Sequence, residues 1–590
     1  MNFRIAPLAA LTAFVFAFAT PAQADWLKAE SEHFVVYADD SEKDVARFAE
    51  ILERYHAAME KLTGRESDPP SPSNRVTIYA VGSQRDVRDL AGGSKFLGGY
   101  YIPRAGASAA FVPDARPSSG QLERPMITLL HEYAHHFFIG SNRFAMPVWI
   151  NEGAAEFFAS ARFPKDGGVE IGRPADHRAM ELRFAVEVPI EELLSRTQSL
   201  PTKKNARYDS FYGQSWALYH YLTFEPSRQG QLSRYGRLIA DGQSSLDAAR
   251  QSFGDLQQLE KELGKYIGQR TKFGFVFGPE NLAIGPVSIS RLSDGLAEMM
   301  PTRIRSKSGV NAQQAQEVVA QARAIAEKYP DDAHVLAALA EAEQDVKNHD
   351  AAVAAADRAI AIDPTVKDAY IQKGYALFDK AVAANDDPEL LRRSLGAFSA
   401  LNKLEIDHPT PLIFYYRIST KNGQKPSENA KHAIEQALKL APFDRGLAMN
   451  VGKMQAREGK ITLARETLAP AAASPHGDRL SRLARLLIDQ LATVPEGMEW
   501  TPGMTTGETA QGAAAEADAP DEEEPGGRVN TSPPGIKRLA PQPRYDRSQD
   551  SAKRTAHGTA TCGSGLLTAT GRLFCQITGH RHRKDGQHLF

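Results

Sequence analysis

Prolines recur in the C-terminal half of the chain with a spacing that few folds produce. They follow apolar stretches rich in Ala, Leu, Glu and Gln, at successive intervals of 34, 45, 33 and 33 residues: Pro330, Pro364, Pro409, Pro442 and Pro475. A period of about 34 residues, with a proline after the second of two helices, is typical of helix pairs that stack side by side. The spacing therefore predicts an all-α solenoid over residues 305–495.

This series resembles tetratricopeptide repeats. Under their period, the interval of 45 residues implies an insertion of about eleven residues, around residues 383–389. The alternative is a helical bundle in which the proline spacing is coincidental. A repeat solenoid offers a concave surface to peptides or proteins but has no chemistry of its own, so any catalytic group has to lie in another part of the chain.

Length and composition limit the classes of function that remain. A chain of 590 residues is too long for one hydrophobic core, so several folded units are expected. The formal net charge of −2 provides no basic field for nucleic acid or for an anionic membrane surface. The two cysteines, Cys562 and Cys575, both lie near the C-terminus, which excludes a thiol nucleophile and a disulfide framework from the predicted folded part.

The first 24 residues have the organisation of a signal peptide. Arg4 precedes an apolar run from residue 5 to residue 19, and Ala22-Gln23-Ala24 fits a signal-peptidase site. The run is shorter than the ~20 residues that span a bilayer, so cleavage after Ala24 is favoured over an uncleaved membrane anchor. We therefore expect an exported protein, periplasmic or secreted by a bacterium, with no membrane span after cleavage.

The segment after the signal peptide has an α+β pattern. Ser41 is a candidate N-cap for an amphipathic helix that ends at Gly64. Runs of β-branched and aromatic residues predict strands at residues 33–38, 75–81, 97–102 and 108–112.

Helices are predicted to follow these strands. Two helical segments between residues 121 and 161 each carry a proline near the start, Pro125 and Pro147. Further helices are expected over residues 205–270, with eight buried positions: Trp216, Leu218, Tyr221, Leu222, Leu256, Leu259, Leu263 and Tyr266.

Residues 496–590 are predicted to be a disordered tail. Gly, Pro, Ala, Thr and acidic residues dominate there, and no apolar periodicity remains. The histidines and cysteines near the C-terminus match no standard zinc module in their spacing.

The chemistry is concentrated in the predicted helix that begins near Pro125. It contains His131-Glu132-Tyr133-Ala134-His135, an H-E-x-x-H pattern. Histidines at positions i and i+4 project from one helical face and can both bind one Zn²⁺. Glu132 is offset around the helix, where it can accept a proton from a water that the metal activates.

A catalytic zinc needs a third protein ligand, and the next predicted helix carries two candidates. Glu152 follows shortly after the chain turns back from His135, and Glu156 lies one turn farther along the same face. With Glu152 as the ligand, Glu156 is free to accept a hydrogen bond from a ligand histidine. Glu156 as the ligand is the alternative, because spacing alone does not choose between neighbouring turns.

The segment from His131 to His135, followed by Asn151-Glu152-Gly153, resembles the gluzincin peptidases, and residues 25–270 as a whole resemble the bacterial peptidase-MA-like proteins more than the aminopeptidase-N-like ones. The resemblance implies an α+β zincin-like metallopeptidase domain over residues 25–300 with Glu152 as third ligand. It also implies a sheet whose edge strand pairs with substrate, a role that we assign to residues 108–112.

The same resemblance indicates a phenol that stabilises the oxyanion. Tyr212-Gly213-Gln214-Ser215 is similar to the Tyr-x-Lys-Gly segment of aminopeptidase-N-like enzymes, with Gln and Ser replacing Lys and Gly. Tyr212 is therefore the first candidate and Tyr208 the alternate. A packed aromatic at the start of a helix is the structural alternative for Tyr212.

Three neighbouring features refine this assignment. His136 points away from the zinc-facing side of its helix, so it is not expected to be a ligand. Asn151 can either bind substrate backbone or cap its helix. Nothing between residues 83 and 123 resembles the Gly-Ala-Met-Glu-Asn segment with which aminopeptidases of this group bind a free α-amine, so endopeptidase action is slightly preferred.

The sequence thus predicts an exported zinc-dependent peptidase that acts on envelope proteins or peptides, with repeats that dock substrate or partner proteins. The alternative is a periplasmic repeat scaffold whose zincin-like domain is not catalytic. The intact set of His131, Glu132, His135 and Glu152 favours the enzyme.

Overall fold

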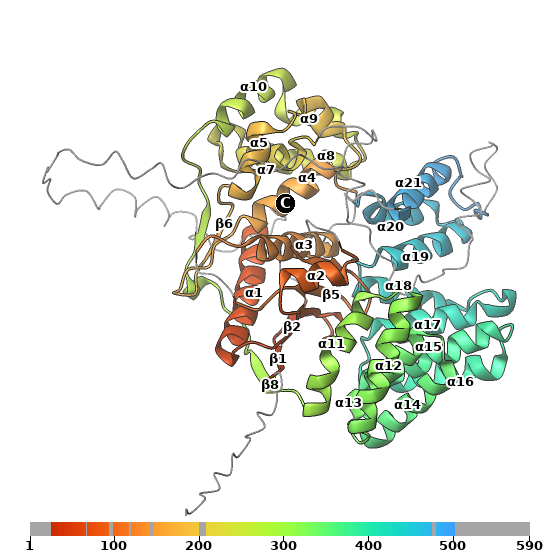
Figure 1. Cartoon of the computed structure of the whole chain (residues 1–590). Coiled ribbons are helices and arrows are strands. Elements are labelled where there is room, and N and C mark those ends of the chain that lie inside the picture. The colour runs from red at the N-terminus through yellow and green to blue at the C-terminus, as the bar shows by residue number, and fades with distance from the viewer. Residues whose placement is uncertain are drawn as a thin grey trace, which may run out of the picture. The chain divides into compact units, whose positions relative to one another are not determined.

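The computed structural model describes residues 25–65, 68–93, 98–116, 120–141, 145–199, 208–474 and 479–501. The predicted signal peptide, Pro475, and the tail beyond residue 501 with both cysteines lie outside these ranges. The described part is mostly helical, with a small sheet region followed by a solenoid-like succession of helices (Figure 1).

The sheet has six strands in the order β4-β5-β3-β2-β1-β8. Strands β2, β3 and β5 are parallel to one another, whereas β4, β1 and β8 join the sheet antiparallel to their neighbours. The strand bounds are β1 Leu27–Glu30, β2 Phe34–Ala38, β3 Val76–Ala80, β4 Tyr100–Ile102, β5 Ala109–Val112 and β8 Ser288–Arg291.

The edge of the sheet differs from the sequence prediction. Residues 108–112, which we assign to the edge, contain β5, and β5 is paired with β3 on one side and with β4 on the other. A strand with two partners has no free backbone row for a peptide, so the assignment of substrate pairing to this segment is wrong. The edge strand on this side of the sheet is β4, which pairs antiparallel with β5 and covers it, and β8 is the strand at the opposite edge.

Helix α1, Glu42–Thr63, runs between the termini that the sequence predicts. The side chain of Ser41 accepts a hydrogen bond from the backbone N–H of Asp44, and Gly64 ends the helix at φ 66°. The left-handed conformation favours glycine at this position. The Tyr55 hydroxyl donates to the carbonyl of Leu130 at 3.2 Å and ties α1 to helix α3.

Helices α3, Arg124–Ser141, and α4, Val148–Ala159, are the two predicted segments with prolines at their starts. Pro125 is the second residue of α3 and Pro147 is the N-cap of α4. Helix α4 packs closely on α7, Phe211–Phe224, where Gly153 faces the carbonyl of Ser215.

The eight apolar positions predicted between residues 205 and 270 are all buried, four in α7 and four among the remaining elements of this region. Their bounds are α2 Gln84–Leu90, β6 Val169–Ile171, α5 Ala179–Phe184, α6 Ile190–Ser195, α8 Gln231–Ala240, α9 Ser245–Phe253, α10 Leu256–Ile267 and β7 Phe275–Phe277.

Helix α11, Asp294–Ser308, crosses the predicted domain boundary at residues 300–305 without a break. Leu296, Met300 and Ile304 pack with residues of the sheet. Met299, in the same helix, belongs to the core that the following helices share. One continuous helix is therefore shared by the sheet region and the first helices of the solenoid.

From α12 onward, each helix packs against the next. Pro330, Pro364 and Pro442 follow the ends of α12, α14 and α18, and Pro409 is the first residue of α17, after the connection from α16. The bounds are α12 Ala312–Lys328, α13 Ala333–Asp345, α14 His349–Ile362, α15 Lys367–Ala383, α16 Pro388–Leu404, α17 Pro409–Ser419, α18 Glu428–Leu440, α19 Arg445–Arg457, α20 Ile461–Ala472 and α21 Arg479–Leu491.

The long proline interval corresponds to longer helices. Helices α15 and α16 have 17 residues each, against 13 in α13 and 14 in α14. The turn between α15 and α16 lies within the segment where the sequence indicates an insertion. The extra residues therefore extend both helices on either side of that turn.

The ordered chain continues past residue 496. Trp500 is buried among apolar residues of α20 and α21, and its backbone N–H donates to the carbonyl of Ala456 at 3.0 Å. The backbone N–H of Gly497 donates to the carbonyl of Gly459 at 2.8 Å. The first residues of the predicted tail thus belong to the fold, because Trp500 provides an apolar anchor. Among the described helices, none combines the length and the hydrophobicity needed to cross a bilayer.

Candidate metal centre

Helix α3 places His131 and His135 on the same face, one turn apart. Their Nε2 atoms are 3.1 Å from each other, and both side chains are buried. Glu132, between them in sequence, is partly exposed and lines the adjacent pocket. The i, i+4 spacing therefore brings the two imidazoles together and turns the intervening carboxylate toward the cavity.

Glu152 on α4 completes a three-residue cluster. Its Oε2 lies 3.2 Å from Nε2 of His131 and 3.6 Å from Nε2 of His135, and the candidate ligand atoms all lie within 4.8 Å of one another. Ligands held at about 2.0–2.1 Å around a tetrahedral zinc are separated by about 3.3 Å. The three separations in this cluster, 3.1, 3.2 and 3.6 Å, are close to that value.

The chemistry of Glu152 also fits a metal ligand. The side chain is fully buried, and within the described residues neither of its oxygens accepts a conventional hydrogen bond. A buried carboxylate without donors is costly unless a cation compensates it. Of the residues that the structure describes, these three form the one group of histidines and carboxylates arranged to hold a metal ion.

The pKa shifts of Glu152 and His131 follow from the same contacts. Burial by itself raises the pKa of Glu152, but the two neighbouring imidazoles lower it well below its usual value. Burial lowers the pKa of His131, yet Glu152 and Glu156 raise it to about 10. The cluster therefore favours a positive charge between its carboxylates.

Glu156 lies on the other side of the His131 ring. Its Oε1 is 3.2 Å from Nδ1 of His131, and its Oε2 is 2.6 Å from Nε2 of His177. Arg178 also forms an ion pair with Glu156. Of the two glutamates left open by the sequence, Glu152 thus faces the paired Nε2 atoms and Glu156 faces the second nitrogen of His131.

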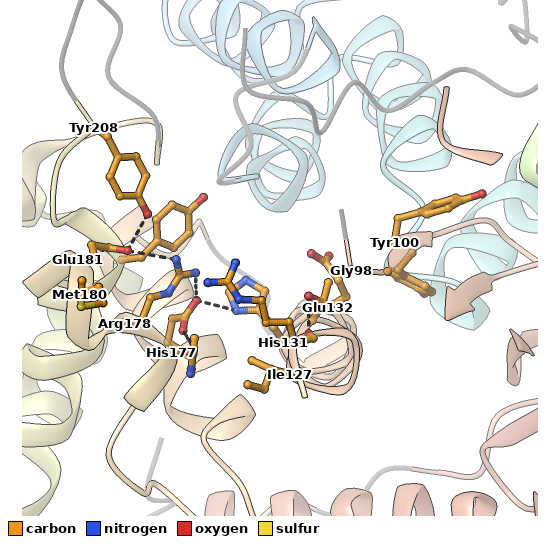
Figure 2. Close-up of a pocket in the computed structure, with 16 residues that line it drawn as sticks. Gly98, Tyr100, Ile127, His131, Glu132, His177, Arg178, Met180, Glu181 and Tyr208 are labelled. Atoms are coloured by element: carbon orange, nitrogen blue, oxygen red, sulfur yellow. Dashed lines mark hydrogen bonds and ion pairs between the residues drawn. The ribbon is translucent and has the colours of Figure 1, made fainter. Parts of the chain in front are cut away.

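A pocket of about 470 Å³ opens beside the cluster. Figure 2 shows His131 and Glu132 projecting toward it, with Arg178, Glu181 and Tyr208 on the facing wall. The edge strand and the residues just before it form another wall: Gly98, Gly99, Tyr100 and Tyr101. A segment bound along β4 would therefore pass the proposed base.

Both tyrosine candidates line this pocket. Tyr208 is 54% exposed, and its hydroxyl donates to Oε2 of Glu181 at 2.8 Å. Tyr212 is partly buried at the start of α7, and burial together with the charge of Glu152 raises its pKa well above the usual value. The Tyr212 phenol therefore stays protonated and able to donate.

Sequence reasoning missed His177, Arg178 and Glu181. They lie in a short 3₁₀ turn and in helix α5, and all three line the pocket. Arg178 Nη1 donates to Oε2 of Glu181 at 3.1 Å, a local i, i+3 pair. The i, i+3 spacing of Arg178 and Glu181 is visible in the sequence, but ordinary surface ion pairs have the same spacing. Only the fold shows that Arg178 also reaches Glu156.

His136 and Asn151 are both engaged away from the cluster. Nδ1 of His136 lies 2.6 Å from the Tyr101 hydroxyl, and burial lowers the pKa of His136 to about 3. Asn151 Nδ2 donates to the carbonyl of Met146 at 3.2 Å, which ties α4 to the segment before it.

The part of the chain that carries the site matches a known protein family. Residues 126–238, which include the cluster and both tyrosines, match the family described as "Protein of unknown function (DUF1570)". No curated protein matches the chain.

Solved structures match part of the chain. One of them is a thermophilic TPR protein from Thermus thermophilus, with 14% identity and a TM-score of 0.27, over 30% of this chain and 91% of its own. A tetratricopeptide assignment therefore rests on the helix pairs and on the proline spacing of this chain.

Proposed function

We propose that this protein is an exported zinc-dependent peptidase. The observation that carries the proposal is the convergence of His131, His135 and Glu152 beside a pocket that also contains Glu132. A catalytic zinc site has three protein ligands and an open position toward substrate. This arrangement supports hydrolysis at a metal centre more directly than a purely structural role.

In the proposed reaction, each nearby side chain has one task. Bound zinc would supply Lewis-acid polarisation of a water molecule and of the scissile carbonyl. Glu132 accepts the proton from the attacking water and later delivers it to the leaving amine. Tyr212 donates a hydrogen bond to the developing oxyanion. Glu156 accepts from Nδ1 of His131 and fixes that ring.

The edge strand supports an extended polypeptide as substrate. Strand β4 is short, lies at the sheet edge and lines the pocket together with His131 and Glu132. An extended peptide can add to such an edge through backbone hydrogen bonds. We therefore prefer endopeptidase action on proteins or peptides of the cell envelope, with the helical solenoid as a docking surface for substrate or partner.

The test is zinc content and hydrolysis in the same preparations of the mature chain. The wild type is expected to hold one zinc per chain, and the His131→Ala, His135→Ala double variant none. Glu132→Gln should keep zinc but lose about 10²–10⁴-fold in hydrolysis of a quenched peptide library, because the base is removed. Glu187→Gln, at an exposed glutamate outside the pocket, is the matched control. Absence of zinc from the reconstituted wild type would exclude the proposal.

The rival function is a periplasmic scaffold that acts through its repeats. The succession of packed helix pairs from α12 to α21 favours it. Complementation of a deletion strain distinguishes the two functions. If the Glu132→Gln variant restores the phenotype as fully as the wild-type protein does, the protein acts as a scaffold.

A further inference from the structure

We propose that Arg178 is a positioning residue that couples the orientation of the metal ligand His131 to that of Tyr212. The inference rests on the proposed function, because it assigns both residues their roles. Arg178 itself is expected to touch neither zinc nor the reacting atoms.

The first half of the coupling runs through Glu156. Arg178 forms an ion pair with Glu156, and Glu156 in turn lies 3.2 Å from Nδ1 of His131. His177 holds the other oxygen of Glu156 at 2.6 Å. Glu156 is almost completely buried, so its orientation is set by these partners and not by water. Arg178 therefore helps to fix the carboxylate that orients the His131 ring.

The second half runs to the start of α7. The Arg178 guanidinium lies over the Tyr212 ring, 4.6 Å from the ring centroid. Its Nη1 donates to Oε2 of Glu181 at 3.1 Å, and Oε1 of Glu181 accepts from the backbone N–H of Gly213 at 2.7 Å. The residue after Tyr212 is thus held by the carboxylate that Arg178 also holds.

Arginine suits this position for a geometric reason. A planar guanidinium can donate to two carboxylates from different edges while its face stacks on an aromatic ring. The ammonium group of lysine keeps the charge but has neither the fork nor the flat face. Arg178→Lys therefore keeps the positive charge and removes the geometry of the guanidinium. We expect this conservative substitution to impair the site.

A double-mutant cycle tests the coupling to Tyr212. If wild type hydrolyses peptide, Arg178→Lys should lower kcat about 10–100-fold with KM changed less than about twofold. In a Tyr212→Phe background, with zinc kept saturating, the same change should cost less than about threefold, because one of the two groups that Arg178 positions is gone and the zinc site stays filled. Arg183→Lys, at an exposed arginine of the adjoining helix α5, is the control and should have no effect. Equal losses in both backgrounds would overturn the coupling.

A second pair of measurements does not depend on hydrolysis. Arg178→Lys should weaken zinc affinity about tenfold in chelator competition, with stoichiometry unchanged. It should also change the near-ultraviolet circular dichroism of tyrosine, and this change should vanish in the Tyr212→Phe background. If wild type binds zinc but cleaves nothing, the proposed function fails while these signals still test Arg178. Unchanged affinity and an unchanged spectrum would refute the positioning role.

Discussion

Two buried glutamates one helical turn apart have different tasks in the proposed site. Glu152 faces the Nε2 atoms of both histidines, whereas Glu156 is occupied by Nδ1 of His131, His177 and Arg178. Substitution of each glutamate by glutamine keeps the volume and removes the charge. We expect Glu152→Gln to lose zinc under dialysis, because an amide is a poor zinc ligand.

Glu156→Gln should behave differently. It removes a charge that orients a ligand, so zinc should remain at one per chain with affinity about 10–100-fold weaker. Inductively coupled plasma emission after dialysis and chelator competition measure the two quantities. The reverse pattern, with zinc lost from Glu156→Gln alone, would make Glu156 the third ligand.

The sequence alone predicts the site residues that are close to one another along the chain. His131, Glu132 and His135 are related by one helical turn, and Glu152 lies on the next helix after a short connection. His177, Arg178 and Glu181 could not be found in this way. Their approach to Glu156 and Tyr212 depends on how α5 packs against α7, and that packing leaves no periodic pattern in the sequence.

At the scale of elements, the contact between α4 and α7 requires glycine at position 153. A Cβ atom there would lie 2.5 Å from the carbonyl oxygen of Ser215, which is backbone and cannot move aside. We predict that Gly153→Ala destabilises the protein by about 1–3 kcal/mol despite the better helix propensity of alanine.

Gly264 in α10 provides the matched control. A Cβ atom at that position would have no neighbour within 4 Å, so Gly264→Ala should stabilise by about 0.5–1 kcal/mol. Urea unfolding followed by circular dichroism compares the two variants with wild type. A stable Gly153→Ala variant would mean that the two helices can separate without cost.

Individual elements were easier to predict than their pairing. The capping residues of α1 and the strand core of β3 can be identified locally, from Ser41, Gly64 and a β-branched run. Which strand lies at the sheet edge is not a local property. It depends on β4 folding back onto β5, and for this reason the sequence wrongly predicts that residues 108–112 form the edge.

At the scale of the whole molecule, the shared helix α11 creates a pH-dependent contact with α13. Ser306 of α11 donates to Asp345 of α13. Burial, followed by the charge of Glu341, raises the pKa of Asp345 to about 7, although the Ser306 hydrogen bond and Lys307 oppose the shift. A carboxyl group with a higher pKa in the folded state stabilises the fold below its unfolded pKa, and this contribution is lost as pH rises toward 7.

The prediction concerns Asp345→Asn, which cannot ionise. Between about pH 5 and pH 8, wild type should lose about 1–2 kcal/mol of unfolding free energy relative to this variant, after allowance for the partial exposure of the group. Urea titrations at several pH values measure the difference. Parallel stability profiles for both proteins would contradict the assigned shift.

The end of the solenoid gives a second prediction at this scale. Trp500 is buried against α20 and α21, although it lies beyond the predicted end of the repeats at residue 495. Trp500→Ala should destabilise this end by about 3 kcal/mol. Hydrogen exchange should then show faster exchange in α19 to α21 and unchanged protection in α3 and α4. Unchanged exchange in α19 to α21 would show that residues 496–501 do not support the fold.

The pairing of the first strand with the last imposes an order on folding during synthesis. Strand β1 begins at Leu27, and its outer neighbour β8 ends at Arg291, with Glu30 opposite Ser288. Until Arg291 leaves the ribosome, one side of β1 has no partner, and the entropy of closing so long a loop slows the pairing. A nascent chain paused before that point exposes an unpaired strand edge, and such edges make partly folded chains prone to aggregate.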